Sequence, residues 1–419
     1  MDPMGIILVR VIFGIISDRF GHKRPLVCNL ILIVAFELGT GFVQSFPQFL
    51  AVRSLFGVGM GGVWGLASST ALENLPVEVR GLASGVLQQG YGSGYLAAAV
   101  INLFLVPNVS VGWRALFWTS AGLSLFAAIV RSLLPESEIF LRAKAAQRAT
   151  GTSTSTAERS RIFVKETGVM LRLHWVVGIY AVLLMTGLSF LSHGSLDLYP
   201  TFLQQTKGFS AHDANVATII STCGAVAGST VAGYISQYLG RRLTIVLCII
   251  WTGAFIPLWI VPTSFSALAA GAFFLQFGSQ GAFGVIPIQL AEVSPPAFRA
   301  TFPGVAYQLS NMISSASSQI EAKGGENLRT TVLINGVAKE VPDYATVQGI
   351  LVGVVAAFIL VVTILGPEAH GAHFEKHKTA FEEGGGRDDA LIEDAGSFGS
   401  SHPIESLDEK EAENLEELA

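Results

Sequence analysis

The sequence predicts an all-α integral membrane protein built from two parallel six-helix repeats. Three observations predict this class. Of the 419 residues, 51% are hydrophobic and only 14% are charged, whereas soluble domains carry about 25% charged residues. Apolar stretches long enough to cross a bilayer recur along the chain. The second half of the chain also repeats glycine, acidic and basic positions of the first half.

Eleven apolar stretches follow one another along the chain and predict about 11 transmembrane helices. Ten of them have the roughly 20 residues that a spanning helix needs. The first is shorter and contains Arg10. The stretches are 4–17, 25–44, 48–72, 81–106, 112–134, 174–204, 213–239, 243–262, 265–291, 300–320 and 346–366.

The repeat appears when the chain is shifted by 219 residues, which aligns GIISDRFGHKR (14–24) with GYISQYLGRRL (233–243). Two parallel halves are typical of transporters that work by alternating access. In the second half a full helix precedes the repeated motif, so we expect the first half to lack its first helix. A truncated start and a natural eleven-span variant would both explain this. The same shift pairs Gly59 with Gly278, Glu73 with Glu292, Arg80 with Arg299 and Gln89 with Gln308.

The Lys and Arg residues of the loops predict the orientation. Fifteen lie in loops on one side of the predicted bundle and five on the other, and basic loops stay in the cytoplasm. We therefore divide the chain into an N-terminal transmembrane half (1–134), a cytoplasmic connection (135–173), a C-terminal six-helix half (174–366) and a cytoplasmic tail (367–419). The tail is acidic, and the Gly-Thr-Ser-rich run in the connection predicts a flexible linker over 145–170.

The loop after the first stretch carries a pattern that suits a conformational gate. Gly21 allows a tight turn, and Asp18 at a helix end can pair with cations in a contact that breaks when the halves move. The loop and the Arg53-x3-Gly57-x3-Gly61 spacing resemble patterns of the major facilitator superfamily, which implies that fold. The predicted gate residues are Gly14, Asp18, Arg19, Gly21, Lys23 and Arg24.

The segment SFLSHGSLDLYPT (189–201) resembles the seventh-helix signature of the fungal JEN-type monocarboxylate/proton symporters, in a branch with sialate and lactate symporters. Ser189 and Leu196 depart from that signature. The resemblance implies proton-coupled symport of small monocarboxylates (lactate, pyruvate, acetate) across the plasma membrane. The matching residues are Ser192, His193, Ser195, Asp197 and Thr201, together with Gln308 and Asn311 of the eleventh helix.

The residues themselves support a polar stripe on this helix. Ser189, His193, Asp197 and Thr201 follow one another at intervals of four residues and share one helix face. Ionisable groups inside a membrane usually face a cavity and mark a transport or proton route. An imidazole one turn from a carboxylate suits a coupling proton, because histidine titrates near physiological pH. The alternative is a structural hydrogen-bond network between helices.

Candidate substrate ligands lie on other helices as well. The guanidinium of Arg53 could bind a carboxylate with two hydrogen bonds, and the alternatives are a fixed acidic partner or an outward-pointing side chain. Gln89 and Gln308 are related by the repeat, so we expect them to face each other across a central cavity. Bonds between packed helices are the alternative for both. Asn311, Ser192, Ser195 and Thr201 complete the predicted substrate-binding set.

The sequence carries no Walker loop, zinc motif or nucleophile elbow, so no enzyme activity, cofactor or metal site is predicted. The expected partners are a small carboxylate, protons and the lipid bilayer, with no nucleic acid, and the protein is expected to be monomeric. Two other interpretations stay open. One is a carrier of a sugar, a sialate-like acid or another organic acid, and the other is a truncated paralogue that does not transport.

Overall fold

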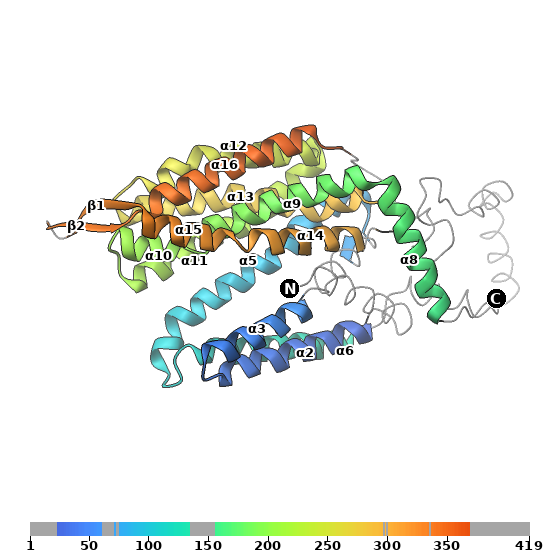
Figure 1. Ribbon diagram of the computed structural model, residues 1–419, viewed down its shortest axis with the longest axis horizontal. Helices are drawn as coiled ribbons and strands as arrows, with labels where there is room; N and C mark the ends of the chain where they lie inside the picture. Colours follow the sequence, from blue (N-terminus) through green and yellow to red (C-terminus); the bar gives the residue numbers. More distant parts are fainter. Residues whose placement is uncertain are drawn as a thin grey trace, which may run out of the picture.

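The computed structural model describes residues 23–60, 71–72, 75–134, 156–295, 298, 301–334 and 337–368. In the N-terminal half these residues form four helices and two single turns (Figure 1). They are α2 (Lys23–Phe42), α3 (Phe46–Met60), η1 (Val77–Val79), α5 (Arg80–Phe104), η2 (Val106–Asn108) and α6 (Arg114–Leu133).

The remaining described residues form one helix before the C-terminal half, the helices of that half and one β-hairpin. In chain order, the first of these elements are α8 (Thr156–Leu173), α9 (Trp175–Leu196), α10 (Tyr199–Thr201), η3 (Phe202–Thr206), α11 (Ala211–Leu239), α12 (Arg241–Ile260) and α13 (Phe265–Val293). They are followed by α14 (Thr301–Ser314), α15 (Ser317–Asn327), β1 (Arg329–Ile334), β2 (Val337–Pro342) and α16 (Tyr344–Leu365).

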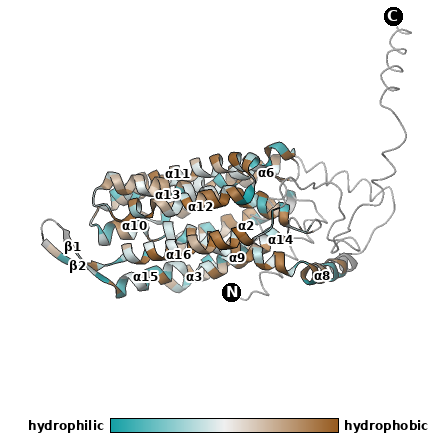
Figure 2. Cartoon of the chain, turned by 90° about the horizontal axis from the view of Figure 1, so that it is seen from above, coloured by the Kyte–Doolittle hydropathy of each residue, from teal (hydrophilic) through white to brown (hydrophobic). Residues whose placement is uncertain are grey.

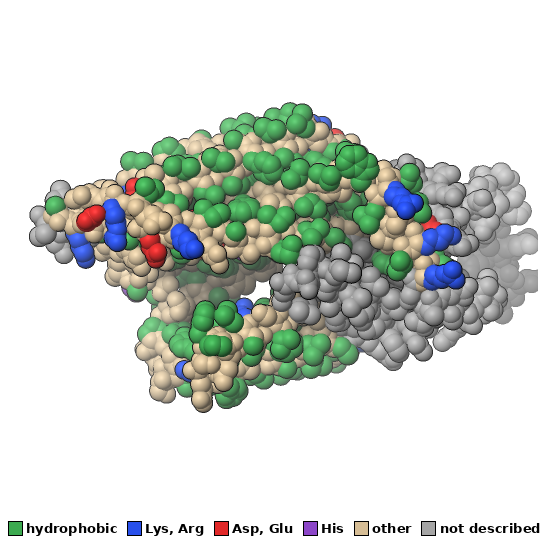
Figure 3. Space-filling view, in the orientation of Figure 1, with side chains coloured by type: hydrophobic (Ala, Val, Ile, Leu, Met, Phe, Trp, Pro, Cys, Tyr) green, Lys and Arg blue, Asp and Glu red, His purple; other side chains and the backbone are tan. Residues whose placement is uncertain are grey.

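The helices pack as two groups that α5 joins. In the first group α2 packs against α3 and α6. In the second, α13 packs against α11 and α12, and α9 packs against α14 and α16. Helix α5 belongs to the first half of the sequence but makes its main contacts with α11 and α13 (Figure 1). On the face in Figure 3 a hollow separates the body of α2, α3 and α6 from the second group.

Helices α5 and α11 run antiparallel and touch backbone to backbone. A Cβ atom added to Gly85 would lie 2.3 Å from the carbonyl oxygen of Ser229, so only glycine fits there. Gly233 lies equally close on the other side, because its added Cβ would be 2.8 Å from the Gly85 Cα. At the far end of the pair the side chains of Asn102 and Asn215 are joined by a 3.1 Å hydrogen bond. The close approach therefore extends along most of both helices.

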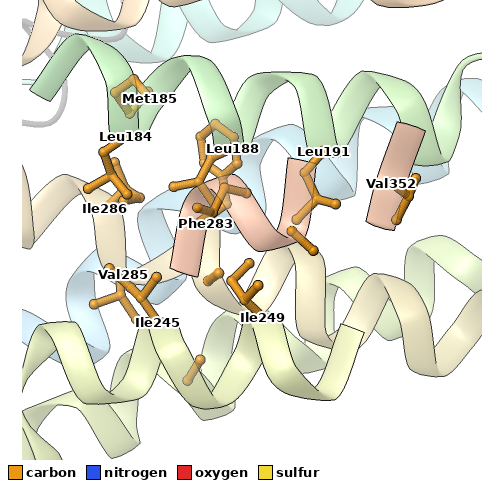
Figure 4. Close-up of a cluster of buried hydrophobic side chains, with 14 of the residues drawn as sticks. Leu184, Met185, Leu188, Leu191, Ile245, Ile249, Phe283, Val285, Ile286 and Val352 are labelled. Atoms are coloured by element: carbon orange, nitrogen blue, oxygen red, sulfur yellow. The ribbon is translucent and has the colours of Figure 1, made fainter. Parts of the chain in front are cut away.

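The apolar core of the second group lies where α9, α12 and α13 meet (Figure 4). Leu184 and Leu188 of α9, Ile249 of α12 and Ile286 of α13 are almost fully buried. Their β- and γ-branched side chains fill the space between three helices, which fixes the position of α9. That matters because α9 carries the predicted polar stripe.

The outer surface suits a bilayer. Large apolar side chains such as Leu133 and Leu365 are exposed, which in a water-soluble protein would favour aggregation. Charged side chains gather mainly at the two ends of the long axis in Figure 3, over α15 with the hairpin and over α8. Figure 2 shows the hydrophobic residues along the helices between these ends, on α9 and α12 among others.

Six helical stretches of the described residues are long and apolar enough to cross a membrane. They are Val77–Asn108, Arg114–Leu133, Trp175–Thr206, Ala211–Leu239, Arg241–Ile260 and Tyr344–Leu365. The predicted stretch 4–17 and part of 48–72 lie outside the described residues. Helix α13 is 29 residues long and coincides with the predicted stretch 265–291, and it carries the buried residues Gln276, Gln280 and Gln289.

Three local features differ from the sequence-based expectation. The predicted flexible linker contains α8, whose Phe163 packs on Phe298 with ring centroids 6.1 Å apart. The predicted stretch 300–320 is two helices, α14 and α15. The hairpin β1–β2 was not predicted, and it pairs Arg329 with Pro342 at its base.

Candidate functional site

The polar stripe begins on α9 and follows it to its end. Ser189 is buried, and its hydroxyl lies 3.2 Å from the hydroxyl of Ser310 on α14. His193 and Asp197 follow at the next two turns. Helix α9 then ends at Leu196, and Thr201 lies in the separate short helix α10, where Pro200 occupies the first turn. The predicted stripe is therefore continuous for three residues rather than four.

His193 and Asp197 are in contact, as their spacing predicted. The Nδ1 atom of the imidazole lies 3.1 Å from Oδ2 of the carboxylate, and each side chain is 33% exposed. Ser318 of α15 donates a hydrogen bond of 2.8 Å to the same carboxylate oxygen. Helix α15 thus holds in place a histidine–carboxylate pair that is one third exposed.

The opposite half of the protein faces this pair through α5. Tyr91 and Tyr95 lie close enough to Asp197 for its charge to act on both phenols. They are one helical turn apart, with ring centroids separated by 6.4 Å. The His193–Asp197 pair therefore lies where α5 of the first half and α9 of the second half meet, as expected of a site between two halves.

Ser195 faces the interior of the second half, whereas Ser192 lies between that interior and the phenol of Tyr91 on α5, with which it also interacts. The Gln280 amide donates to the Ser192 hydroxyl at 2.9 Å, and the Gln276 amide donates to the Ser195 hydroxyl at 2.8 Å. Both serines and both glutamines are buried. Neither glutamine was predicted as a site residue from the sequence. Their signal is an i, i+4 pair of amides in an otherwise apolar stretch.

The three amide side chains predicted to bind substrate lie in different environments. Gln89 hydrogen-bonds the Thr230 hydroxyl and, at 3.4 Å, the Val226 carbonyl of α11. It therefore makes the bond between packed helices that was considered as its alternative. Gln308 and Asn311 are half-buried on α14. That helix is linked to the polar stripe of α9 by the Ser189–Ser310 contact.

Arg53 has a fixed acidic partner. Its guanidinium lies 3.2 Å from Oε1 of Glu37 on α2 and 4.2 Å from the ring centroid of Phe56. The Glu37 side chain is 8% exposed and that of Arg53 is 34% exposed. This contact favours the structural alternative for Arg53 over an anchor for substrate.

The predicted gate lies mostly outside the described residues, including Gly14, Asp18, Arg19 and Gly21. Lys23 begins α2, and Arg24 follows it in the helix.

The counterpart of this gate loop in the second repeat is described. There the fully buried Arg241 and Glu292 are 2.9 Å apart, and both oxygens of Glu368 accept backbone N–H groups at the start of α12. Gln237 links this cluster to the other half, because its side chain accepts from Gly81 N and donates to Val77 O.

Two groups of apolar helices, joined by α5 and sharing a polar site between them, define a multi-pass membrane carrier. The chain belongs to the Major Facilitator Superfamily, whose model matches residues 3–318. The fold class and the family resemblance predicted from the sequence are thus confirmed. The predicted lack of enzyme activity agrees with this family of carriers.

Relatives with curated names are transporters. The chain is 32% identical over 371 residues to the carboxylic acid transporter protein homolog of Saccharomyces cerevisiae, covering 85% of this chain and 59% of that protein. It therefore spans less than two thirds of the length of this relative. It is 28% identical over 313 residues to the "Probable 4-methylmuconolactone transporter" of Cupriavidus pinatubonensis, with 73% and 68% covered. A cis,cis-muconate transport protein of Acinetobacter baylyi is 25% identical over 325 residues, with 77% and 76% covered.

Solved structures confirm the fold. The chain superposes on the partially occluded, inward-open xylose transporter XylE of E. coli with a TM-score of 0.64 at 17% identity, covering 88% of this chain and 87% of that chain. At this identity the likeness concerns the fold alone.

Proposed function

We propose that the protein is a proton-coupled symporter of small monocarboxylates such as lactate, pyruvate and acetate, and that it works by alternating access. The observation that carries the proposal is the partly exposed contact of His193 with Asp197, between α9 of one half and α5 of the other. The curated relatives support the substrate class, because their names refer to a carboxylic acid, a muconolactone and muconate.

The pair suits a coupling proton. The imidazole of His193 can bind a proton and lies 3.1 Å from the Asp197 carboxylate, and Ser318 keeps that carboxylate oriented. A negative membrane interior opposes entry of an anion by about 2.3 kcal/mol per charge per 100 mV. One proton carried with each anion removes this cost, because the pair that crosses the membrane is then neutral.

Gln308, Asn311 and Thr201 are the proposed ligands of the carboxylate substrate. All three are half-buried: Gln308 and Asn311 lie on α14, next to the Ser310 that contacts Ser189 of α9, and Thr201 lies in α10, after the end of α9. Ser192 and Ser195 would shape the site together with Gln280 and Gln276, to which they are hydrogen-bonded. Amides and hydroxyls can orient a carboxylate without adding a fixed charge.

Uptake of labelled lactate tests the proposal in cells that lack their own lactate carrier. We expect uptake to rise several-fold when the external solution is made acidic, and His193→Ala to remove this dependence. His212→Ala is the matched control, because His212 is an exposed histidine on α11. Uptake that ignores external pH would contradict the coupling. The complete absence of lactate uptake by the protein would contradict the substrate class.

A second candidate function is transport of a different organic acid by the same kind of carrier. The relatives named for a muconolactone and for muconate favour a larger organic acid. Inhibition of lactate uptake by muconate at lower concentrations than by pyruvate would support this candidate. Inhibition by glucose would favour the sugar alternative instead.

The carrier is further proposed to be a monomer in the plasma membrane, with its C-terminal tail in the cytoplasm. The excess of Lys and Arg in the loops on one side of the bundle supports this orientation.

A further inference from the structure

Glu321 of α15 is a buried carboxyl group that the sequence analysis did not single out. Its residue is 0% exposed. One carboxyl oxygen, Oε2, accepts a long hydrogen bond of 3.4 Å from the amide of Gln348 on α16. The other oxygen, Oε1, has no hydrogen-bond partner among the described residues. The ion pairs of the described residues do not include Glu321 either.

This carboxyl group lies directly behind the His193–Asp197 pair. Gly194 follows His193 on α9, and a Cβ atom added to it would lie 3.0 Å from Oε1 of Glu321. The glycine therefore lets the carboxyl group pack against α9. Ser318, one turn before Glu321 on α15, is the residue that donates to Asp197. The charge of Asp197 also acts on Glu321.

Within the part of the chain that the structure describes, the other elements around Glu321 bring no positive charge into contact with it. Helix α16 contributes Gln348, and its Tyr344 ring packs against Gly325 of α15. Strand β2 carries Lys339 and Glu340, which are both exposed to solvent. The negative charge that faces Glu321 is that of Asp197 on α9. A buried carboxylate with one weak partner and a like charge nearby is costly, whereas a protonated carboxyl group is not.

We propose that Glu321 is a second proton-binding group of this carrier, which holds the coupling proton behind the His193–Asp197 pair. The inference rests on the proposed proton coupling. An O–H bond forms on Glu321 when a proton arrives from water on the outer side by way of the exposed pair. It breaks when the proton is released to water on the inner side, and nothing is oxidised or reduced.

Reconstituted protein separates coupling from substrate movement. In liposomes that contain the 419-residue chain, an acidic outer solution should drive accumulation of labelled lactate by the wild type. We expect Glu321→Gln to lower this accumulation at least about tenfold, since an anion that moves without a proton cannot be driven by the pH gradient. Exchange of labelled for unlabelled lactate at equal pH should stay within about twofold of wild type, because exchange needs no net proton transfer.

The matched control is Glu326→Gln, which removes an exposed carboxylate from the same helix and should leave both activities unchanged. Normal exchange also shows that Glu321→Gln is folded. If Glu321→Gln accumulates lactate like the wild type, the inference is wrong. If the wild type shows no acid-driven accumulation, the proposed function fails, and this inference fails with it.

A direct measurement of the proton does not depend on transport. Infrared difference spectra between acidic and alkaline solutions should show the carbonyl band of a protonated carboxyl group in the wild type. Exposed carboxylates also contribute to this band in acid, so the informative part is the high-frequency component of a buried carboxyl group without a strong hydrogen bond. That component should be lost in Glu321→Gln and kept in Glu326→Gln. If it persists in Glu321→Gln, another carboxyl group holds the proton and Glu321 has only a structural role.

Discussion

At the scale of single residues, Arg53 and Glu37 form an ion pair between α3 and α2 in the first half. Glu37 is the more buried partner, and Arg53 also lies against the ring of Phe56. Removing one partner of such a pair leaves the other charge uncompensated, whereas removing both does not. The pair therefore offers a way to distinguish a structural arginine from one that binds substrate.

We expect Arg53→Gln to lower the free energy of unfolding by about 1–2 kcal/mol, a value reduced from that of a fully buried pair because Arg53 is partly exposed. The double variant Arg53→Gln/Glu37→Gln should recover most of this loss and most of the lactate uptake. Thermal unfolding in detergent and uptake in cells measure the two effects. A double variant that is stable but cannot take up lactate would show that Arg53 contacts the substrate.

The residues of the site differ in how far the sequence could predict them. The His193–Asp197 contact followed from a four-residue spacing on one helix, which is a local property. Ser318, Gln280 and Glu321 reach the site from other helices. Their roles depend on how α9 packs against α13 and α15, and one sequence does not reveal that packing. The partner of Gln89, Thr230, lies on α11 and could not be foreseen for the same reason.

At the scale of helices, the contact of α5 with α11 is what joins the two halves. It depends on glycines, because the added Cβ of Gly85 would overlap the Ser229 carbonyl oxygen at 2.3 Å. Gly90 lies on the same helix, and an added Cβ there would have no described atom within 4 Å. Gly85 and Gly90 thus have the same helical backbone, but only Gly85 packs against another helix.

Gly85→Ala should destabilise the protein by about 1–3 kcal/mol, because α5 must move away from α11. Gly90→Ala should be neutral or slightly stabilising, since alanine favours the helix over glycine. Thermal unfolding of the two purified variants in one detergent measures the difference. Equal melting temperatures would mean that α5 does not pack on α11 through Gly85.

Element boundaries were predicted well where apolar length decides them and poorly where tertiary contacts do. Helices α11, α12 and α16 lie within a few residues of the predicted stretches. Helix α8 was missed, because the burial of Phe163 and Met170 against the bundle is a tertiary effect. The hairpin had a local signal, since Asn335-Gly336 between two runs rich in β-branched residues is typical of a tight β-turn.

At the scale of the whole molecule, the separation of charge predicts which end faces the cytoplasm. Helix α8 and the hairpin lie at opposite ends of the long axis (Figure 1). The sequence places α8 in the basic connection between the halves, and basic loops remain in the cytoplasm. The hairpin follows α15 and should therefore lie outside the cell. This orientation could be predicted from the repeat and the charges of the loops. That α5 packs against α11 and α13 of the other half could be seen only in the structure.

Labelling of single cysteines tests this orientation in intact cells. The three native cysteines, Cys28, Cys223 and Cys248, are first replaced by alanine. We expect Lys339→Cys on β2 to react with a membrane-impermeant maleimide in intact cells, because that position is exposed on the hairpin. Arg161→Cys on α8, which is also exposed, should react only after the membrane is permeabilised. The cysteine-free protein is the control. Labelling of Arg161→Cys in intact cells would show that the orientation is opposite to the one proposed.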